Sequence, residues 1–157
     1  MKGFNAKNHA LRLIELKPRS VQEIRDRLAK KGVEKAEIEA ITAELEAIGL
    51  LDDVKFARDW IENRQHFRPM GVIRLRQELF AKGIDREIVE AVLSQYRSQV
   101  DEKSEAMALA RKKLRTLQGL KPEAARRRLA GFLARRGFST EAVALALRSI
   151  STKINKG

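Results

Sequence analysis

The chain contains no cysteine, and only three prolines, two histidines, one tryptophan and one tyrosine among its 157 residues. Without cysteine, disulfides and thiolate metal sites are excluded, which fits a reducing compartment. His9 and His66 lie far apart in the sequence, so we expect no zinc site. No apolar run approaches the length of a membrane span, and MKGFNAKNHALRL lacks the apolar core of a signal peptide. We therefore expect a cytoplasmic protein without a metal or cofactor.

Motifs of catalysis are also missing. The phosphate loop G-x-x-x-x-G-K-[ST] does not occur, there is no cysteine nucleophile, and no Ser-His-acid grouping stands out. Asp52 and Asp53 are a pair of carboxylates that an enzyme could use to hold Mg²⁺, but hard cations need more converging oxygens. We interpret one of them as a helix cap and the other as a favourable charge at the helix N-terminus. We therefore predict that the protein is not an enzyme.

Charge is abundant and unevenly distributed. The chain holds 33 Lys and Arg against 21 Asp and Glu, a net charge of +12. Residues 1–103 hold 20 basic against 18 acidic side chains, a net +2, whereas residues 104–157 hold 13 against 3, a net +10. A basic third of this kind favours a polyanionic partner, because neutralising phosphates releases counterions. A solvated surface that keeps the protein soluble is the alternative.

Apolar residues recur at helical spacing along nearly the whole chain, and no segment alternates with period two. The pattern predicts an all-α fold of about nine helices. Ser20 and Glu23 form a capping box for the second helix, Pro122 suits the start of the eighth, and Ser139 can cap the ninth. We expect residues 151–157 to fray. The third helix is expected to direct four apolar residues inward: Ile38, Ile41, Leu45 and Ile48.

The stretch from Gly49 to Gly83 predicts two capped helices joined by a sharp corner. Gly49 is placed to close the preceding helix in a left-handed conformation. Asp52 or Asp53 offers a side-chain oxygen to cap the next helix. A break at Gly71 separates that helix from a second one, which ends at Gly83.

Three aromatic residues of this stretch, Phe56, Trp60 and Phe67, fall on one helical stripe. A stripe of this kind is typical of a buried face, and we interpret it as core. Base-stacking aromatics are the alternative. Arg64 lies on the same stripe, where it either anchors a buried carboxylate or closes the end of the stripe.

An internal repeat underlies the whole pattern. RDRLAKKGVEKAEIEAIT, RQELFAKGIDREIVEAVL and AGFLARRGFSTEAVALAL share their spacing, with Gly32, Gly83 and Gly137 in register and 51 and 54 residues apart. Self-similarity at this period predicts three tandem three-helix repeats, residues 1–51, 52–100 and 101–157, in an elongated curved array. We expect a monomer, because each repeat already has a neighbour.

The central repeat also resembles a known family. The spacing L-D-D-x-x-F-A-x-x-W-I-x-x-R followed by G-x-x-x-L-x-x-E-L-x-x-K-G-I, at positions 51–64 and 71–84, is similar to the central motif of the RecX family, the regulators of the RecA recombinase. Residues 10–28 and 133–139 match as well, whereas residues 102–131 match in basic character more than in sequence. The motif residues include Asp52, Asp53, Phe56, Trp60, Gly71 and Gly83.

The resemblance implies a bacterial protein that controls RecA. Family members bind the RecA nucleoprotein filament, mostly block its extension or promote its disassembly, and lower ATP hydrolysis, strand exchange and repressor cleavage. We therefore expect a RecA inhibitor that lies in the filament groove, with the RecA filament and single- and double-stranded DNA as partners. A free-standing DNA-binding protein that competes for DNA is the alternative, and a helical adaptor is a further one.

The candidate contacts to this partner are basic residues on three predicted helices. Arg127 and Arg135 are favoured, and Arg74 would extend the basic track to the middle repeat. Because adjacent arginines cannot all face one way, we expect one or two of the triplet 126–128 to pack through their stems. The full set of predicted binding residues is Arg74, Arg111, Lys112, Arg115, Arg126, Arg127 and Arg135.

Overall fold

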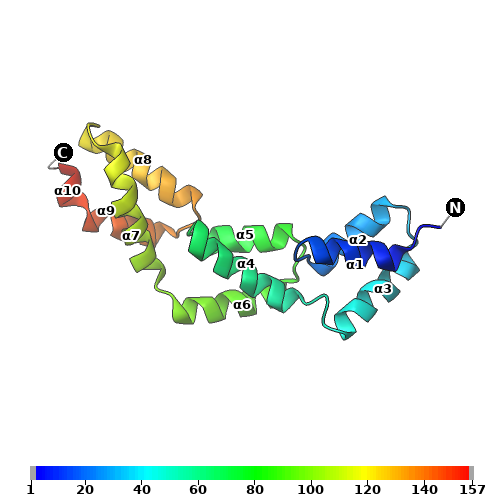
Figure 1. Cartoon of the computed structure of the whole chain (residues 1–157). Coiled ribbons are helices and arrows are strands. Elements are labelled where there is room, and N and C mark those ends of the chain that lie inside the picture. Colours follow the sequence, from blue (N-terminus) through cyan, green and yellow to red (C-terminus); the bar gives the residue numbers. More distant parts are fainter. Residues whose placement is uncertain (1–2, 156–157) are drawn as a thin grey trace. The chain divides into compact units, whose positions relative to one another are not determined.

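The computed structural model describes residues 3–155, and within that range it contains helices and no strands. The all-α prediction is therefore confirmed. The elements, in chain order, are α1 (Ala6–Leu16), α2 (Val21–Lys30), α3 (Lys35–Ala47), α4 (Asp53–Phe67), α5 (Val72–Ala81), α6 (Arg86–Gln99), α7 (Glu102–Leu114), the 3-10 helix η1 (Arg115–Leu117), α8 (Pro122–Arg135), α9 (Thr140–Ser149) and α10 (Ser151–Asn155) (Figure 1).

The chain divides into two compact units. The N-terminal unit comprises residues 1–60 and 79–92, and the C-terminal unit comprises residues 61–78 and 93–157. The boundaries fall inside α4, α5 and α6. The repeat boundaries and the curved shape expected from the sequence stay predictions.

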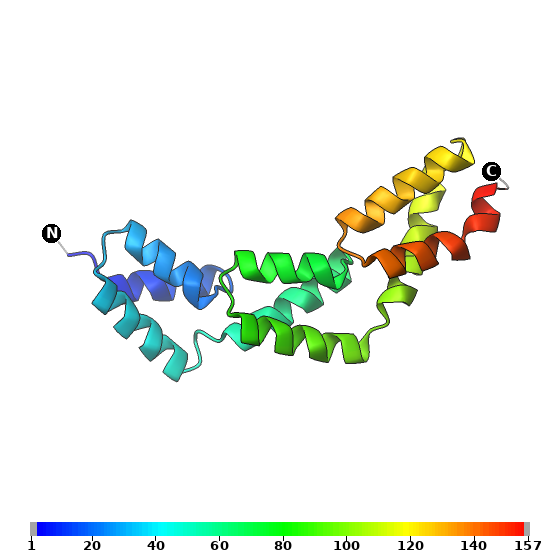
Figure 2. The same ribbon diagram turned by 180° about the vertical axis from the view of Figure 1, so that it is seen from behind.

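In the N-terminal unit, α1 and α3 pack against α2 (Figures 1 and 2). A core of aliphatic side chains lies between these helices. Asn5 caps α1 by accepting from the Asn8 N–H at 2.9 Å, and Ser20 caps α2 by accepting from the Glu23 N–H at 3.1 Å. The buried core consists of Ala6, Ala10, Leu13, Val21, Ile24, Leu28, Ile38, Ile41, Leu45 and Leu51.

The three aligned glycines adopt one backbone geometry. Their φ angles are 81° at Gly32, 75° at Gly83 and 85° at Gly137, a left-handed conformation that suits glycine. At each corner the N–H after the glycine donates to a carbonyl five residues back, at 3.1 to 3.2 Å. The glycine N–H donates three residues back, at 2.9 to 3.0 Å. These paired bonds form a Schellman motif, so the repeat seen in the sequence is also a repeat of backbone structure.

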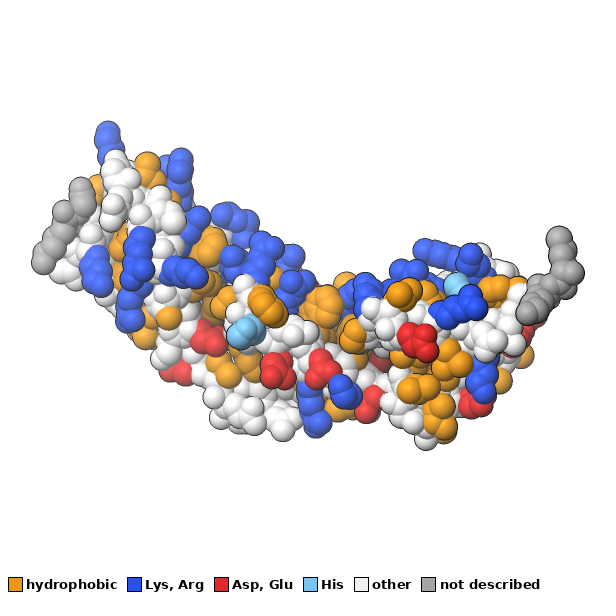
Figure 3. Space-filling model, viewed as in Figure 1, with side chains coloured by type: hydrophobic (Ala, Val, Ile, Leu, Met, Phe, Trp, Pro, Cys, Tyr) orange, Lys and Arg blue, Asp and Glu red, His pale blue; other side chains and the backbone are white. Residues whose placement is uncertain are grey.

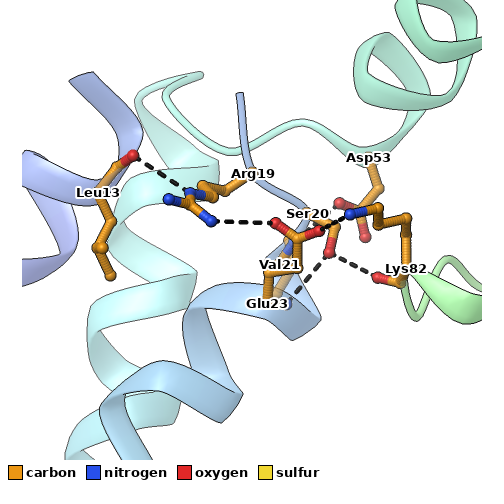
Figure 4. A network of polar contacts seen from close by, with 7 residues as sticks. All are labelled: Leu13, Arg19, Ser20, Val21, Glu23, Asp53 and Lys82. Carbon is orange, nitrogen blue, oxygen red and sulfur yellow. Dashed lines mark hydrogen bonds and ion pairs between the residues drawn. The ribbon is translucent and has the colours of Figure 1, made fainter. Parts of the chain in front are cut away.

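The Gly83 corner docks on the N-terminus of α2, and we call this contact the first junction (Figure 4). The Ser20 hydroxyl, which is fully buried, donates to the Lys82 carbonyl at 2.6 Å. The Lys82 ammonium lies 2.9 Å from the Glu23 carboxylate, and Arg19 approaches the other oxygen of that carboxylate at 3.9 Å. A Cβ at Gly83 would lie 2.4 Å from the Gln22 Cβ, so the corner and the first turn of α2 are in close contact at this point.

The paired carboxylates have separate structural roles. Asp52 caps its own helix by accepting from the Lys55 N–H at 3.1 Å. Asp53, in the first turn of α4, accepts from the N–H of Val21 at 2.9 Å and so caps α2 as well (Figure 4). Burial raises the pKa of Asp53, and the Val21 hydrogen bond opposes that shift.

In the C-terminal unit, α7, α8, α9 and α10 enclose a second core. Ser139 caps α9 by accepting from the Ala142 N–H at 3.2 Å, and Pro122 stands in the first turn of α8, both as predicted. The expected fraying of the tail is wrong for residues 151–155, which form α10, because Ile154 is only 4% exposed and anchors that helix in the core. The rest of the predicted tail, residues 156–157, lies outside the described residues.

Two core predictions are also wrong. Phe67 is 79% exposed and Ile48 is 62% exposed, although both follow the spacing of a buried stripe. Each lies at the C-terminal end of its helix, where a stripe can run past the neighbour that would cover it. Phe56, at 8% exposed, is core as predicted, and its ring stacks on Trp60 with centroids 5.9 Å apart. Of the two alternatives for Arg64, the structure shows the anchored carboxylate, since its Nε donates to Glu78 at 2.9 Å.

Candidate polyanion-binding site

All seven predicted binding residues lie on the surface of the C-terminal unit. Space-filling coloring shows Lys and Arg side chains gathered over α8 and the start of α5 in this unit (Figure 3). The triplet Arg126, Arg127 and Arg128 is exposed at all three positions, and the expectation that one or two pack through their stems stays a prediction. The physical reason for this exposure is that α8 buries only every third or fourth residue here, at Ala125 and Leu129, and the triplet falls between them.

The Gly137 corner docks on the N-terminus of α5, and we call this contact the second junction. The N–H of Gly71 donates to the Arg136 carbonyl at 2.7 Å, and the N–H of Ile73 donates to the Gly137 carbonyl at 3.2 Å. A Cβ at Gly71 would lie 2.2 Å from the Gly137 oxygen, and a Cβ at Gly137 would lie 2.3 Å from the backbone nitrogen of Arg74. The two backbones therefore meet without side chains between them.

This backbone contact brings four arginines together. Arg68, Arg74, Arg135 and Arg136 line a hollow of about 500 Å³, which we call the four-arginine hollow. Its remaining lining residues are Met70, Gln77, Phe132 and Ala134, so within residues 3–155 no carboxylate lines it. Arg74 and Arg135 come from the predicted set, whereas Arg68 precedes Pro69 in a loop and Arg136 precedes the corner glycine.

The charges in the four-arginine hollow are only partly compensated. Arg136 donates from Nη1 to the Pro69 carbonyl at 3.0 Å, and Arg74 has its Nε 3.6 Å from a Glu78 oxygen outside the lining. Burial lowers the pKa of Arg136, and the nearby positive charge of Arg68 lowers it further. A guanidinium stays protonated despite such a shift, so the repulsion persists until an anion enters.

Phe132 is the aromatic residue of this hollow, and two cationic side chains already lie over its ring. The Lys113 ammonium lies 5.0 Å from the ring centroid, and the Arg136 guanidinium carbon lies 4.9 Å from it. These are cation–π distances. The hollow therefore offers guanidinium groups for phosphate or carboxylate oxygens rather than a free ring for base stacking.

A second basic hollow lies elsewhere in the C-terminal unit. Arg111 and Arg115 line a space of about 550 Å³ together with Lys153 of α10. Lys112 is exposed but does not line it. The structure therefore separates six of the seven predicted residues into three groups, Arg74 with Arg135, Arg111 with Arg115, and Arg126 with Arg127 on α8, and leaves Lys112 outside them.

Sequence reasoning missed three of the residues that line these hollows: Arg68, Arg136 and Lys153. Arg136 had a detectable signal, because Lys31 and Lys82 precede the corner glycine at the same repeat position. Arg68 and Lys153 had none, since both reach their hollows through tertiary packing. Among the described residues, no group of three or more His, Cys, Asp or Glu is placed to hold a metal ion, and no helix there has the length and apolar character to cross a membrane.

Repeated three-helix units, identical glycine corners and a strongly basic C-terminal surface define the class: a tandem helical-repeat protein. The family models agree in detail, since those for the first, second and third three-helix domains of RecX match residues 6–45, 52–93 and 101–147. The chain belongs to the RecX family, whose curated members are regulatory proteins.

Several relatives and solved structures are similar to the chain. Regulatory protein RecX of Streptomyces lividans is 35% identical over 129 residues, covering 82% of this chain and 68% of the relative. That of Prosthecochloris aestuarii is 33% identical over 147 residues, covering 94% of each. The crystal structure of RecX from Lactobacillus salivarius has a TM-score of 0.80 at 20% identity, covering 94% of this chain and 95% of that one, which supports the fold.

Proposed function

We propose that this protein regulates the RecA recombinase by binding the RecA–DNA filament, and that it acts as an inhibitor that blocks extension or promotes disassembly. Membership of a family of regulatory proteins supports the regulatory role, and the resemblance in the central motif supplies RecA as the partner. A ligand that prefers one state of the filament shifts the population toward that state, so no catalytic group is needed.

The observation that carries this proposal is the four-arginine hollow in a chain of this family. Four guanidinium groups without a lining carboxylate suit oxyanions at close range. DNA phosphates and the acidic side chains of a filament both meet that requirement. The cations over Phe132 argue against base readout, so binding is expected to depend on salt and not on DNA sequence.

RecA's single-strand-dependent ATP hydrolysis on preformed filaments tests the proposal, with DNA in excess over both proteins. We expect a fall at amounts of this protein well below one per RecA. We expect Arg135→Glu to raise the concentration for half-maximal inhibition on the order of tenfold, because it places a carboxylate in the hollow. Arg148→Glu is the matched control, since it makes the same charge change at an exposed position of the same unit outside the hollow.

A free-standing DNA-binding protein is the second candidate. It is favoured by the same four arginines of the hollow, whose charges are only partly compensated. It predicts no effect on preformed filaments under excess DNA, together with salt-sensitive binding to bare DNA. Inhibition that disappears when DNA is added in excess would support this candidate and contradict filament binding. If Arg135→Glu inhibits as well as the natural chain does, the contact lies outside the hollow, and RecA is still the partner.

A further inference from the structure

The corner at the end of α2 has the geometry of the two docked corners, but no helix of the described residues docks on it. We call Lys30, Lys31 and Gly32 the open corner. The Val33 N–H donates to the Leu28 carbonyl at 3.1 Å, as at the other two corners. A Cβ at Gly32 would have nothing within 4 Å, and both lysines are exposed.

The two docked corners share one recognition pattern. In each, the carbonyl before the glycine accepts from the residue that precedes a helix: from the Ser20 hydroxyl at 2.6 Å or from the Gly71 N–H at 2.7 Å. The basic side chain at the same position reaches the same helix end. Lys82 pairs with Glu23 at 2.9 Å, and Arg136 donates to the Pro69 carbonyl at 3.0 Å.

Elementary electrostatics explains the pattern. The last carbonyls of a helix carry partial negative charge, and the first N–H groups of a helix carry partial positive charge. A corner therefore complements a helix N-terminus, and a lysine beside the corner complements a carboxylate in the first turn. Lys31 stands at the position of Lys82 and Arg136 in the repeat.

We propose that the open corner binds the N-terminal turn of a helix in a partner protein, one with serine or glycine before the helix and a glutamate in its first turn. A second copy of this chain fits less well. The helix of its third repeat that corresponds to α2 is α8, which has Lys121 rather than serine or glycine before its first residue, and the residues in register with 21–23 are the exposed Arg126, Arg127 and Arg128 in the next turn of that helix. The proposal does not depend on RecA as the partner.

The test is a titration of the ¹⁵N-labelled full chain with an acetylated, amidated peptide of residues 18–30, PRSVQEIRDRLAK, followed by NMR. This peptide carries the Ser20 and Glu23 groups that the first junction uses. We expect saturable shifts at the amides of Lys31, Gly32 and Val33. We expect none at Gly83 and Gly137, whose corners are already docked.

Variants distinguish docking from general charge attraction. The peptide carries four basic and two acidic side chains, a net +2, so general attraction predicts tighter binding to any Lys→Glu protein. Docking predicts that Lys31→Glu weakens peptide binding roughly tenfold, and that Glu23→Gln in the peptide also weakens it. The matched variant Lys30→Glu should change binding less than Lys31→Glu does.

Three outcomes would overturn the proposal. The first is an absence of shifts at the open corner at millimolar peptide, and the second is tighter binding by both Lys→Glu variants. The third is movement of these amides with protein concentration alone, which would assign the corner to a second copy of the chain.

Discussion

The first and second junctions perform the same task with different chemistry. At the first, side chains make the contact: the Ser20 hydroxyl, the Glu23–Lys82 ion pair and the Asp53 carboxylate. At the second, backbone groups of Gly71 and Gly137 meet directly. The comparison teaches that the glycine corner is the common element and that either side chains or backbone groups can complete the contact with it. The two junctions should therefore fail under different perturbations.

Replacing the corner glycine should have the largest effect, and only where the corner is docked. Gly137→Ala combines a left-handed φ of 85° with a Cβ that would lie 2.3 Å from the Arg74 backbone, so we expect a loss of at least about 3 kcal/mol. Gly32→Ala has nearly the same φ and no neighbour, and should cost about 1 kcal/mol. Urea unfolding followed by circular dichroism measures both. Equal losses would mean that the steric contact does not matter.

Removing the buried hydroxyl of the first junction should have the next largest effect. Ser20→Ala loses the cap of α2 and also leaves the Lys82 carbonyl without its donor, so we expect about 2 kcal/mol. Ser139→Ala loses only a cap, at about 1 kcal/mol. Urea unfolding followed by circular dichroism measures both losses, and fluorescence of Trp60, the single tryptophan, reports in addition on the N-terminal unit that holds Ser20. A smaller loss for Ser20→Ala than for Ser139→Ala would contradict the junction hydrogen bond.

Breaking the ion pair should have a smaller effect, again confined to the first junction. The Glu23 side chain is 18% exposed and the Lys82 side chain 30%, so Glu23→Gln should cost about 1 kcal/mol. Asp59→Asn breaks the exposed pair with Lys55 and should leave stability almost unchanged. Raising the salt concentration should reduce the Glu23→Gln difference only slightly, because the pair is largely shielded from solvent. Strong salt dependence would indicate an exposed contact.

The smallest effect concerns pH. Burial raises the pKa of Asp53, so the folded state holds this proton more tightly than the unfolded state does. The contribution of Asp53 to stability therefore falls as pH rises through its folded-state pKa and is regained on acidification. The difference in unfolding free energy between the natural chain and Asp53→Asn should follow this direction between pH 3 and 7. A carboxyl ¹³C titration midpoint at or below that of an unstructured aspartate would contradict it.

Much of this protein follows from local sequence. The period of the apolar residues determined that the chain is helical, because a helix must bury one stripe. Ser20, Pro122 and Ser139 marked helix starts through their caps, and three glycines marked the corners, because few other residues tolerate a left-handed conformation. The motif at positions 51–84 was specific enough to indicate the family.

Only the tertiary structure decided which of these elements meet. The arginines at 68, 74, 135 and 136 form one hollow because Gly71 and Gly137 allow two backbones to touch, and no spacing in the sequence encodes that approach. Phe67 continues a buried stripe yet is exposed, since burial requires a neighbour as well as a period. Periodicity and caps act within one helix, whereas contacts between helices depend on the packing of residues far apart in the chain. That is why the surface that we propose as the binding site appears only in three dimensions.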